Sequence, residues 1–129
     1  MEHLVLLKFN SNIKDTKEEE TFVRQAGDML TKIPGVLQVC AGRSFTKERA
    51  NRYTHAVRVR LRCKEDLKIY ATHPIHLKYK EKYIVPLIDK TTKDPVCAVD
   101  FVSEIFTVPS ASDRGSFATI PSRVSDTPS

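Results

Sequence analysis

The sequence predicts one α+β domain, built from a four-stranded antiparallel sheet with helices on one face. The length of 129 residues suits one domain with a short extension. A composition of 40% hydrophobic and 29% charged residues is typical of soluble globular domains. The expected elements follow in the order strand, helix, strand, strand, helix, strand, which is the ferredoxin-like arrangement.

The first half of the chain predicts a strand, a helix and a second strand. Residues 3–9 (HLVLLKF) have strand composition and are followed by three polar residues. Thr16 and Glu19 have the spacing of a capping box, which predicts that a helix begins there. Apolar side chains then recur at helical spacing: Phe22, Ala26, Met29, Leu30 and Ile33. Pro34 and Gly35 end the helix, and residues 36–40 form the short second strand.

The second half begins with a polar, exposed connection over residues 43–52. Residues 53–62 are the clearest strand, because apolar residues and the arginines Arg58, Arg60 and Arg62 alternate along it. Residues 64–72 predict a short helix. Pro74 begins a second helical segment that reaches residue 87, and residues 96–102 form the fourth strand.

A sheet with helices on a single face leaves its other face open, and a second copy of the sheet is the natural cover. We therefore expect a homodimer that forms a dimeric α+β barrel. The three arginines would face the partner sheet, where Asp100 is a candidate counter-charge because it alternates with Val99 and Phe101. A solvated arginine face near a sheet edge is the alternative interpretation.

The chain divides into a folded part, residues 1–106, and a tail, residues 107–129, that is rich in Ser, Thr and Pro. Such a composition buries too little apolar surface to become ordered, so we expect a flexible tail. The three cysteines, Cys40, Cys63 and Cys97, are too far apart for a CxxC pair and predict reduced thiols. With no apolar run of membrane-spanning length and no signal-peptide pattern, we expect a cytoplasmic protein without a membrane partner.

Nucleic acid and metal are not expected as ligands. The net charge of +5 is modest, and no aromatic side chain interleaves the arginine stripe to stack on bases. His73 and His76 lie close in sequence and could suggest a metal site. Pro74 separates them, however, and no third ligand has a recognisable spacing.

Two histidines are predicted to point into the apolar interior. Alternation places His3 beside Val5 and Leu7, and it places His55 beside Val57 and Val59. A single buried histidine is usually a satisfied core residue, but two that face one space indicate a polar-lined pocket.

The segment Tyr70-Ala-Thr-His73-Pro74-Ile-His76 resembles the YxxHPxH element of the stress-responsive A/B barrel family, whose members are small dimeric α+β barrel proteins. The resemblance runs from residue 3 to about residue 102. It includes the opening strand, the turn at residues 33–36, the strand entry at residues 53–55 and the ending at residues 99–101.

The resemblance implies a function as well as a fold. In plant polyketide cyclases of this family, a tyrosine and the second histidine of the element carry an intramolecular aldol condensation. The matching residues here are Tyr70, as donor to a carbonyl oxygen, and His76, as base; a phenol and an imidazole suit these roles. The implied ligand is a small apolar or ketone-bearing molecule, and no metal or organic cofactor is required. The expected substrate-binding residues are His3, Val5, Leu7, Phe22, His55, Val57, Val59 and His73.

The alternative function belongs to a different class. It is a non-catalytic, stress-associated homodimer whose pocket binds a small ligand.

Overall fold

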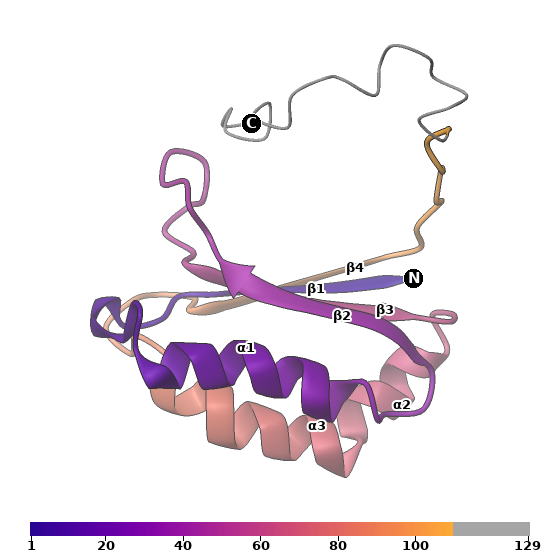
Figure 1. The fold of residues 1–129 in the computed structure, drawn as a ribbon, viewed down its shortest axis with the longest axis horizontal. Coiled ribbons are helices and arrows are strands. Elements are labelled where there is room, and N and C mark those ends of the chain that lie inside the picture. Colours follow the sequence, from indigo (N-terminus) through magenta and orange to yellow (C-terminus); the bar gives the residue numbers. More distant parts are fainter. Residues whose placement is uncertain (110–129) are drawn as a thin grey trace.

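The computed structural model describes residues 1–109 (Figure 1). The expected tail, residues 107–129, lies outside the described residues from residue 110 onward. The elements are β1 (Glu2–Leu7), η1 (Ser11–Ile13), α1 (Lys17–Leu30), β2 (Val36–Arg43), β3 (His55–Leu61), α2 (Asp66–Thr72), α3 (Pro74–Tyr79), the π-helical turn η2 (Lys80–Ile84), η3 (Val85–Leu87) and β4 (Val96–Phe101).

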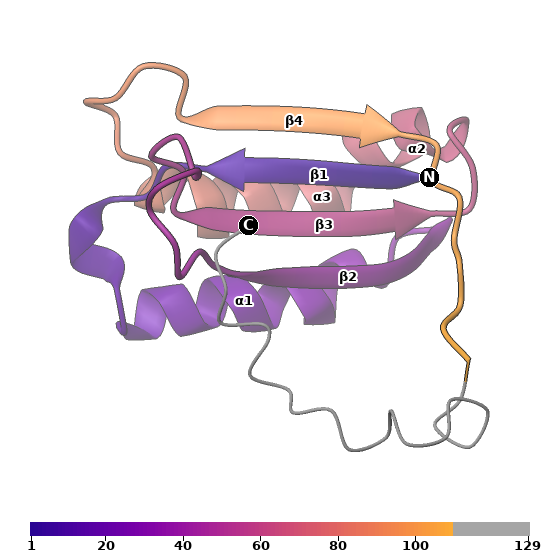
Figure 2. The same ribbon diagram turned by 90° about the horizontal axis from the view of Figure 1, so that it is seen from above.

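The four strands form one antiparallel sheet in the order β2-β3-β1-β4. The helices α1, α2 and α3 lie on one face of this sheet, and its other face carries no helix (Figures 1 and 2). The predicted ferredoxin-like order is therefore confirmed. Among residues 1–109, no helix has both the length and the hydropathy needed to cross a bilayer.

Helix α1 begins as the capping box predicted. The Thr16 hydroxyl accepts a hydrogen bond from the Glu19 backbone N–H at 3.3 Å. The Glu19 carboxylate accepts in return from the backbone N–H of Asp15 at 2.9 Å. The first bond satisfies one of the amide groups that a helix start leaves unpaired, and the second fixes the residue before the N-cap.

The turn after α1 requires glycine. Gly35 has φ of +90°, and a Cβ there would lie 2.7 Å from a carboxylate oxygen of Asp66. Any side chain would be strained and would also displace this carboxylate, which lies at the start of α2. The turn between α1 and β2 and the start of α2 are thus packed directly against each other.

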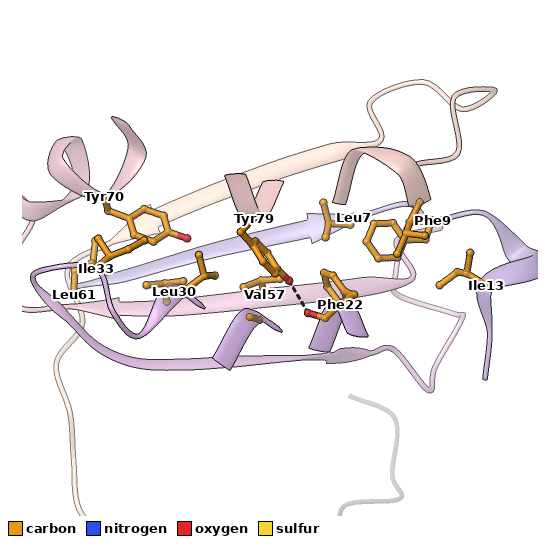
Figure 3. Close-up of a cluster of buried hydrophobic side chains, with 13 residues drawn as sticks. Leu7, Phe9, Ile13, Phe22, Leu30, Ile33, Val57, Leu61, Tyr70 and Tyr79 are labelled. Atoms are coloured by element: carbon orange, nitrogen blue, oxygen red, sulfur yellow. Dashed lines mark hydrogen bonds between the residues drawn. The ribbon is translucent and has the colours of Figure 1, made fainter. Parts of the chain in front are cut away.

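The hydrophobic core fills the space between the sheet and the helices (Figure 3). It joins side chains from both layers, among them Leu7 of β1, Phe22 and Leu30 of α1, and Tyr79 of α3, all almost completely buried. The Tyr79 hydroxyl donates a hydrogen bond to the Phe22 carbonyl at 2.7 Å (Figure 3). This bond ties α3 to α1 and satisfies a buried polar group.

The expectation that Asp100 neutralises the arginine stripe is wrong. Glu2 accepts hydrogen bonds from Arg58 at 2.9 Å and from Arg60 at 2.8 Å, while Arg62 pairs with Asp66. Asp100 is opposite His3 in the β1–β4 register and faces the helices. Alternation along β4 correctly predicts that Asp100 and its neighbours Val99 and Phe101 point to opposite faces of the sheet. Only the pairing of β4 with β1 shows that Val99 and Phe101 lie on the open face and Asp100 on the helix-covered face.

Glu2 makes stability dependent on pH. Burial alone would raise its pKa, but hydrogen bonds from Ser103, Arg58 and Arg60 hold the pKa at about 2, below the ordinary value of 4.5. Because the folded-state pKa is the lower one, this stabilisation is present above pH 4.5 and disappears as the pH falls towards 2.

We predict that Glu2→Gln lowers the free energy of unfolding at pH 7 by at most about 3 kcal/mol, the linkage equivalent of that shift. The difference from the wild type should shrink steadily between pH 5 and pH 2. Urea unfolding at a series of pH values measures it, with Glu48→Gln, an exposed carboxylate of the β2–β3 loop, as the control. If the variant stayed less stable than the wild type by a constant amount down to pH 2, the stabilisation would not come from the ion pairs of Glu2.

Candidate functional site

The candidate site is the aromatic ring of Tyr70 together with two imidazoles. Tyr70 in α2 is almost completely buried. Its ring centroid lies 4.6 Å from that of His76 in α3 and 5.6 Å from that of His3 in β1. Three residues predicted from the sequence therefore meet at one end of the sheet, where β1 and β4 pass over α2 and α3 (Figure 2).

The break between α2 and α3 places His76 against Tyr70. His73 ends one helix and caps the next with an extended backbone, and its Nδ1 accepts a hydrogen bond from the Ile75 N–H at 3.1 Å. Pro74 occupies the first turn of α3, where its missing N–H costs no hydrogen bond. The role of His73 that the structure shows is therefore a helix cap.

His76 is arranged as a base. Its Nδ1 lies 2.9 Å from the Ala71 carbonyl oxygen, which can only accept, so Nδ1 carries the proton and Nε2 keeps its lone pair. Burial lowers the pKa of His76, and the nearby Lys80 and His3 lower it further, against the opposing effect of the Ala71 carbonyl. The imidazole is therefore neutral at pH 7 and able to take up a proton.

Tyr70 is arranged as a donor. Burial raises the pKa of the Tyr70 phenol far above its ordinary value of 10, so the hydroxyl keeps its proton at every physiological pH. Within the described residues the hydroxyl makes no hydrogen bond, whereas that of Tyr79 is bonded to Phe22. The Tyr70 hydroxyl is therefore not committed to another described group, although the residue as a whole is only 3% exposed.

His3 is held by a carboxylate. Its Nδ1 makes a short hydrogen bond to Asp100, directly across the β1–β4 pair. A carboxylate can only accept, so Nδ1 of His3 carries a proton, and Nε2 forms no hydrogen bond within the described residues. The sequence analysis did not connect Asp100 with His3, although strand pairing is the signal that would have done so. No sequence signal points to the Ala71 carbonyl.

His55 lies at the other end of the sheet. In the β-sheet register it faces Leu7, whereas His3 faces Val59, four residues or about 13 Å further along β3. Both ring nitrogens of His55 are hydrogen-bonded, Nε2 to Glu19 at 2.6 Å and Nδ1 to Thr54 at 2.8 Å. Burial lowers the pKa of His55, and Glu19 opposes that effect. The structure does not bring this imidazole to Tyr70.

The apolar residues predicted to bind substrate form part of the packed core. Each of Leu7, Phe22, Val57 and Val59 is at most 3% exposed, and Val5 packs against the same cluster. Three surface hollows are lined by other residues, and none of the three includes Tyr70 or His76. The substrate-binding role of these core residues stays a prediction. In residues 1–109 no cluster of three or more His, Cys, Asp or Glu side chains could hold a metal ion.

The four-stranded antiparallel sheet with helices on one face defines a small ferredoxin-like α+β protein (Figure 1). Comparison with known proteins identifies its family. The Stress responsive A/B Barrel Domain profile matches residues 1–103, and the chain belongs to this family.

Two curated relatives share the domain. Olivetolic acid cyclase from Cannabis sativa is 31% identical over 84 residues, which are 64% of this chain and 82% of that protein. The stress-response A/B barrel domain-containing protein DABB1 from Arabidopsis thaliana is 28% identical over 106 residues. Those residues are 81% of this chain and 47% of DABB1, so the match spans about half of that relative.

Solved structures share the fold. A dimeric ferredoxin-like protein of unknown function from Thermobifida fusca has a TM-score of 0.62 at 20% identity, covering 79% of this chain and 89% of that one. Hydroxynitrile lyase from Passiflora edulis has a TM-score of 0.64 at 17% identity, covering 82% of this chain and 95% of that one.

We predict that His76 and His73 adopt opposite neutral tautomers. At pH 8, long-range ¹H–¹⁵N spectra should show His76 protonated on Nδ1, because Ala71 accepts its proton. His73 should be protonated on Nε2, because its Nδ1 accepts from Ile75. A spectrum with both rings protonated on Nε2 would contradict the geometry of the site.

Proposed function

We propose that this A/B barrel protein is a cofactor-independent, cyclase-like enzyme that closes a ring in a small ketone-bearing molecule by intramolecular aldol condensation. The observation that carries the proposal is a neutral imidazole with a free Nε2 next to a phenol that keeps its proton at neutral pH, with ring centroids 4.6 Å apart. The relative named a cyclase, similar over most of its length, supports the same reaction class.

The reaction needs only these groups. Nε2 of His76 removes a proton from a methylene between two carbonyls, and the resulting carbanion attacks a second carbonyl carbon of the same molecule. As the new carbon–carbon bond forms, the π pair of that carbonyl moves to its oxygen, and the Tyr70 hydroxyl stabilises this oxyanion by donating a hydrogen bond to it. The imidazolium of His76 then gives its proton to the oxygen, so the aldol adduct is an isomer of the substrate and both residues return to their starting states.

His3 completes the polar side of the site. Its bond to Asp100 fixes the ring, and its Nε2 can form a hydrogen bond with a hydroxyl group of the ligand. No step requires a metal or an organic cofactor. The three free cysteines support action in the cytoplasm.

The proposed enzyme is a homodimer. Leu4, Leu6, Val99 and Phe101 lie on the open face of the sheet, and Val99 and Phe101 are each 47% exposed. A second copy would bury these apolar side chains together with the Glu2–Arg58–Arg60 ion pairs. Dimeric proteins of the same fold support this assembly.

One observation favours the second candidate function, a non-catalytic homodimer that binds a small ligand. The expected lining side chains Leu7, Phe22, Val57 and Val59 are packed in the core and offer little surface to a substrate. A ligand would then contact only the Tyr70 hydroxyl and the imidazoles around it.

We predict that His76→Ala lowers turnover of a linear poly-β-ketone analogue by about 10²- to 10⁴-fold, as loss of a general base does. Tyr70→Phe should lower it by about 10²- to 10³-fold, as loss of an oxyanion donor does. Product formation is followed by chromatography, with Tyr83→Phe, the same substitution in the π-helical turn that follows α3, as the control. Ligand-induced thermal stabilisation without turnover in the wild type would establish the binding protein instead.

The pH dependence of kcat/KM should report His76. Since its pKa is lowered, activity should persist below pH 6.5 and fall only as the pH drops further and the imidazole is protonated. Lys80→Gln removes one of the charges that lower this pKa, so the acid limb should move to higher pH. Lys78→Gln, an exposed lysine of α3, should leave the limb in place. Equal movement in both variants would refute the assignment to His76.

The dimer is tested on the open face. Phe101→Lys places a charge among apolar side chains and should raise the dimer dissociation constant by at least about tenfold, because a buried unpaired charge costs several kcal/mol. Ile69→Lys is the control, because Ile69 lies in α2, away from the open face, and its 50% exposure is similar to that of Phe101. This variant should keep the molar mass of the wild-type dimer. Light scattering over a concentration series measures both. A wild-type monomer at all concentrations would rule the dimer out.

A further inference from the structure

A second candidate ligand site lies at the end of the sheet remote from Tyr70. The β2–β3 loop, residues 44–54, and the segment of residues 10–14 before α1 enclose a hollow of about 600 Å³. The hollow is lined by His55, which is itself buried, by Thr54, and by the aromatic residues Phe45 and Tyr53. A volume of this size fits a small organic molecule.

All charged side chains that line this hollow are positive. Four of its lining residues are cationic, namely Lys14, Arg43, Lys47 and Arg52, and no Asp or Glu lines it. Arg43 forms ion pairs with Asp15 at 3.1 Å and with Glu19 at 3.6 Å. Within residues 1–109 Lys14, Lys47 and Arg52 form no ion pair. These three like charges repel one another, and an anion in the hollow would relieve that repulsion.

The hollow is shaped by backbone hydrogen bonds and so exists before a ligand arrives. The Ser44 N–H donates to the Thr54 carbonyl at 2.8 Å, and the Tyr53 N–H donates to the Ala50 carbonyl at 2.8 Å. Asn51 and Arg52 both have positive φ, a conformation that turns the chain sharply. The Tyr53 hydroxyl anchors the loop to the Asp94 carbonyl at 3.1 Å.

We propose that this hollow binds a small organic phosphate monoester. A phosphate monoester carries nearly two negative charges at neutral pH and offers three acceptor oxygens, which matches several cations around one space. The organic part would pack against the ring of Phe45, which is 81% exposed in the absence of a ligand. This site is separate from the Tyr70–His76 pair and does not depend on the cyclase proposal.

The test is titration of the full chain with phenyl phosphate, followed by ¹H–¹⁵N correlation spectra. We expect saturable shifts confined to residues 10–14 and 43–55, and no such shifts with phenol, which has the ring without the charge. The double variant Lys47→Gln with Arg52→Gln should bind at least about tenfold more weakly, as expected for loss of charged hydrogen bonds.

The control is a second double variant that loses the same two positive charges outside the hollow. Lys32→Gln with Lys78→Gln, both exposed and outside the hollow, should keep the wild-type affinity. Shifts that do not saturate at millimolar ligand, equal weakening in both double variants, or equal binding of phenol would each overturn the proposal. The spectra of the variants also show directly whether each is folded, so a misfolded variant is not mistaken for one that has lost its site.

Discussion

The pairing register of β1 is the constraint on which the rest of the structure depends. β1 lies between β3 and β4, and two of its successive residues face opposite sides of the sheet. Glu2 joins the arginines on the open face, while His3 turns towards the helices, Tyr70 and Asp100. A slip of one residue would exchange the two side chains and leave both faces with unpaired charge.

The histidines at the two ends of the sheet differ in how their ring nitrogens are hydrogen-bonded. At one end, His55 is enclosed by Phe9 and Phe22, with both ring nitrogens bonded to protein, so it acts as a structural residue. At the other end, the imidazoles of His3 and His76 each have one nitrogen fixed and one free. Residue type alone does not make a histidine reactive; a free lone pair in a partly desolvated place does.

Much of the fold was predictable from local signals. The Thr16–Glu19 capping box and the alternation of β3 depend on neighbouring residues, and the structure confirms both. The expected helix end at Pro34-Gly35 is wrong by about one turn, because α1 already ends at Leu30 and Ile33 lies in the turn that follows. The partner of the arginines was not predictable in this way. Alternation divides a strand into two faces without saying which face is covered, and that choice is made by the pairing of β1 with β4.

The sequence by itself determined the order of the elements and the start of α1, because both follow from spacings of a few residues along the chain. The Tyr70–His76 pair was expected from the resemblance of one short motif to the family. Only the tertiary structure decided that His3 joins this pair and His55 does not, and that Ala71 and Asp100 each bind one ring nitrogen of an imidazole. These contacts depend on strand register and on the break between α2 and α3, which arise from packing over the whole domain and are not encoded in any short segment.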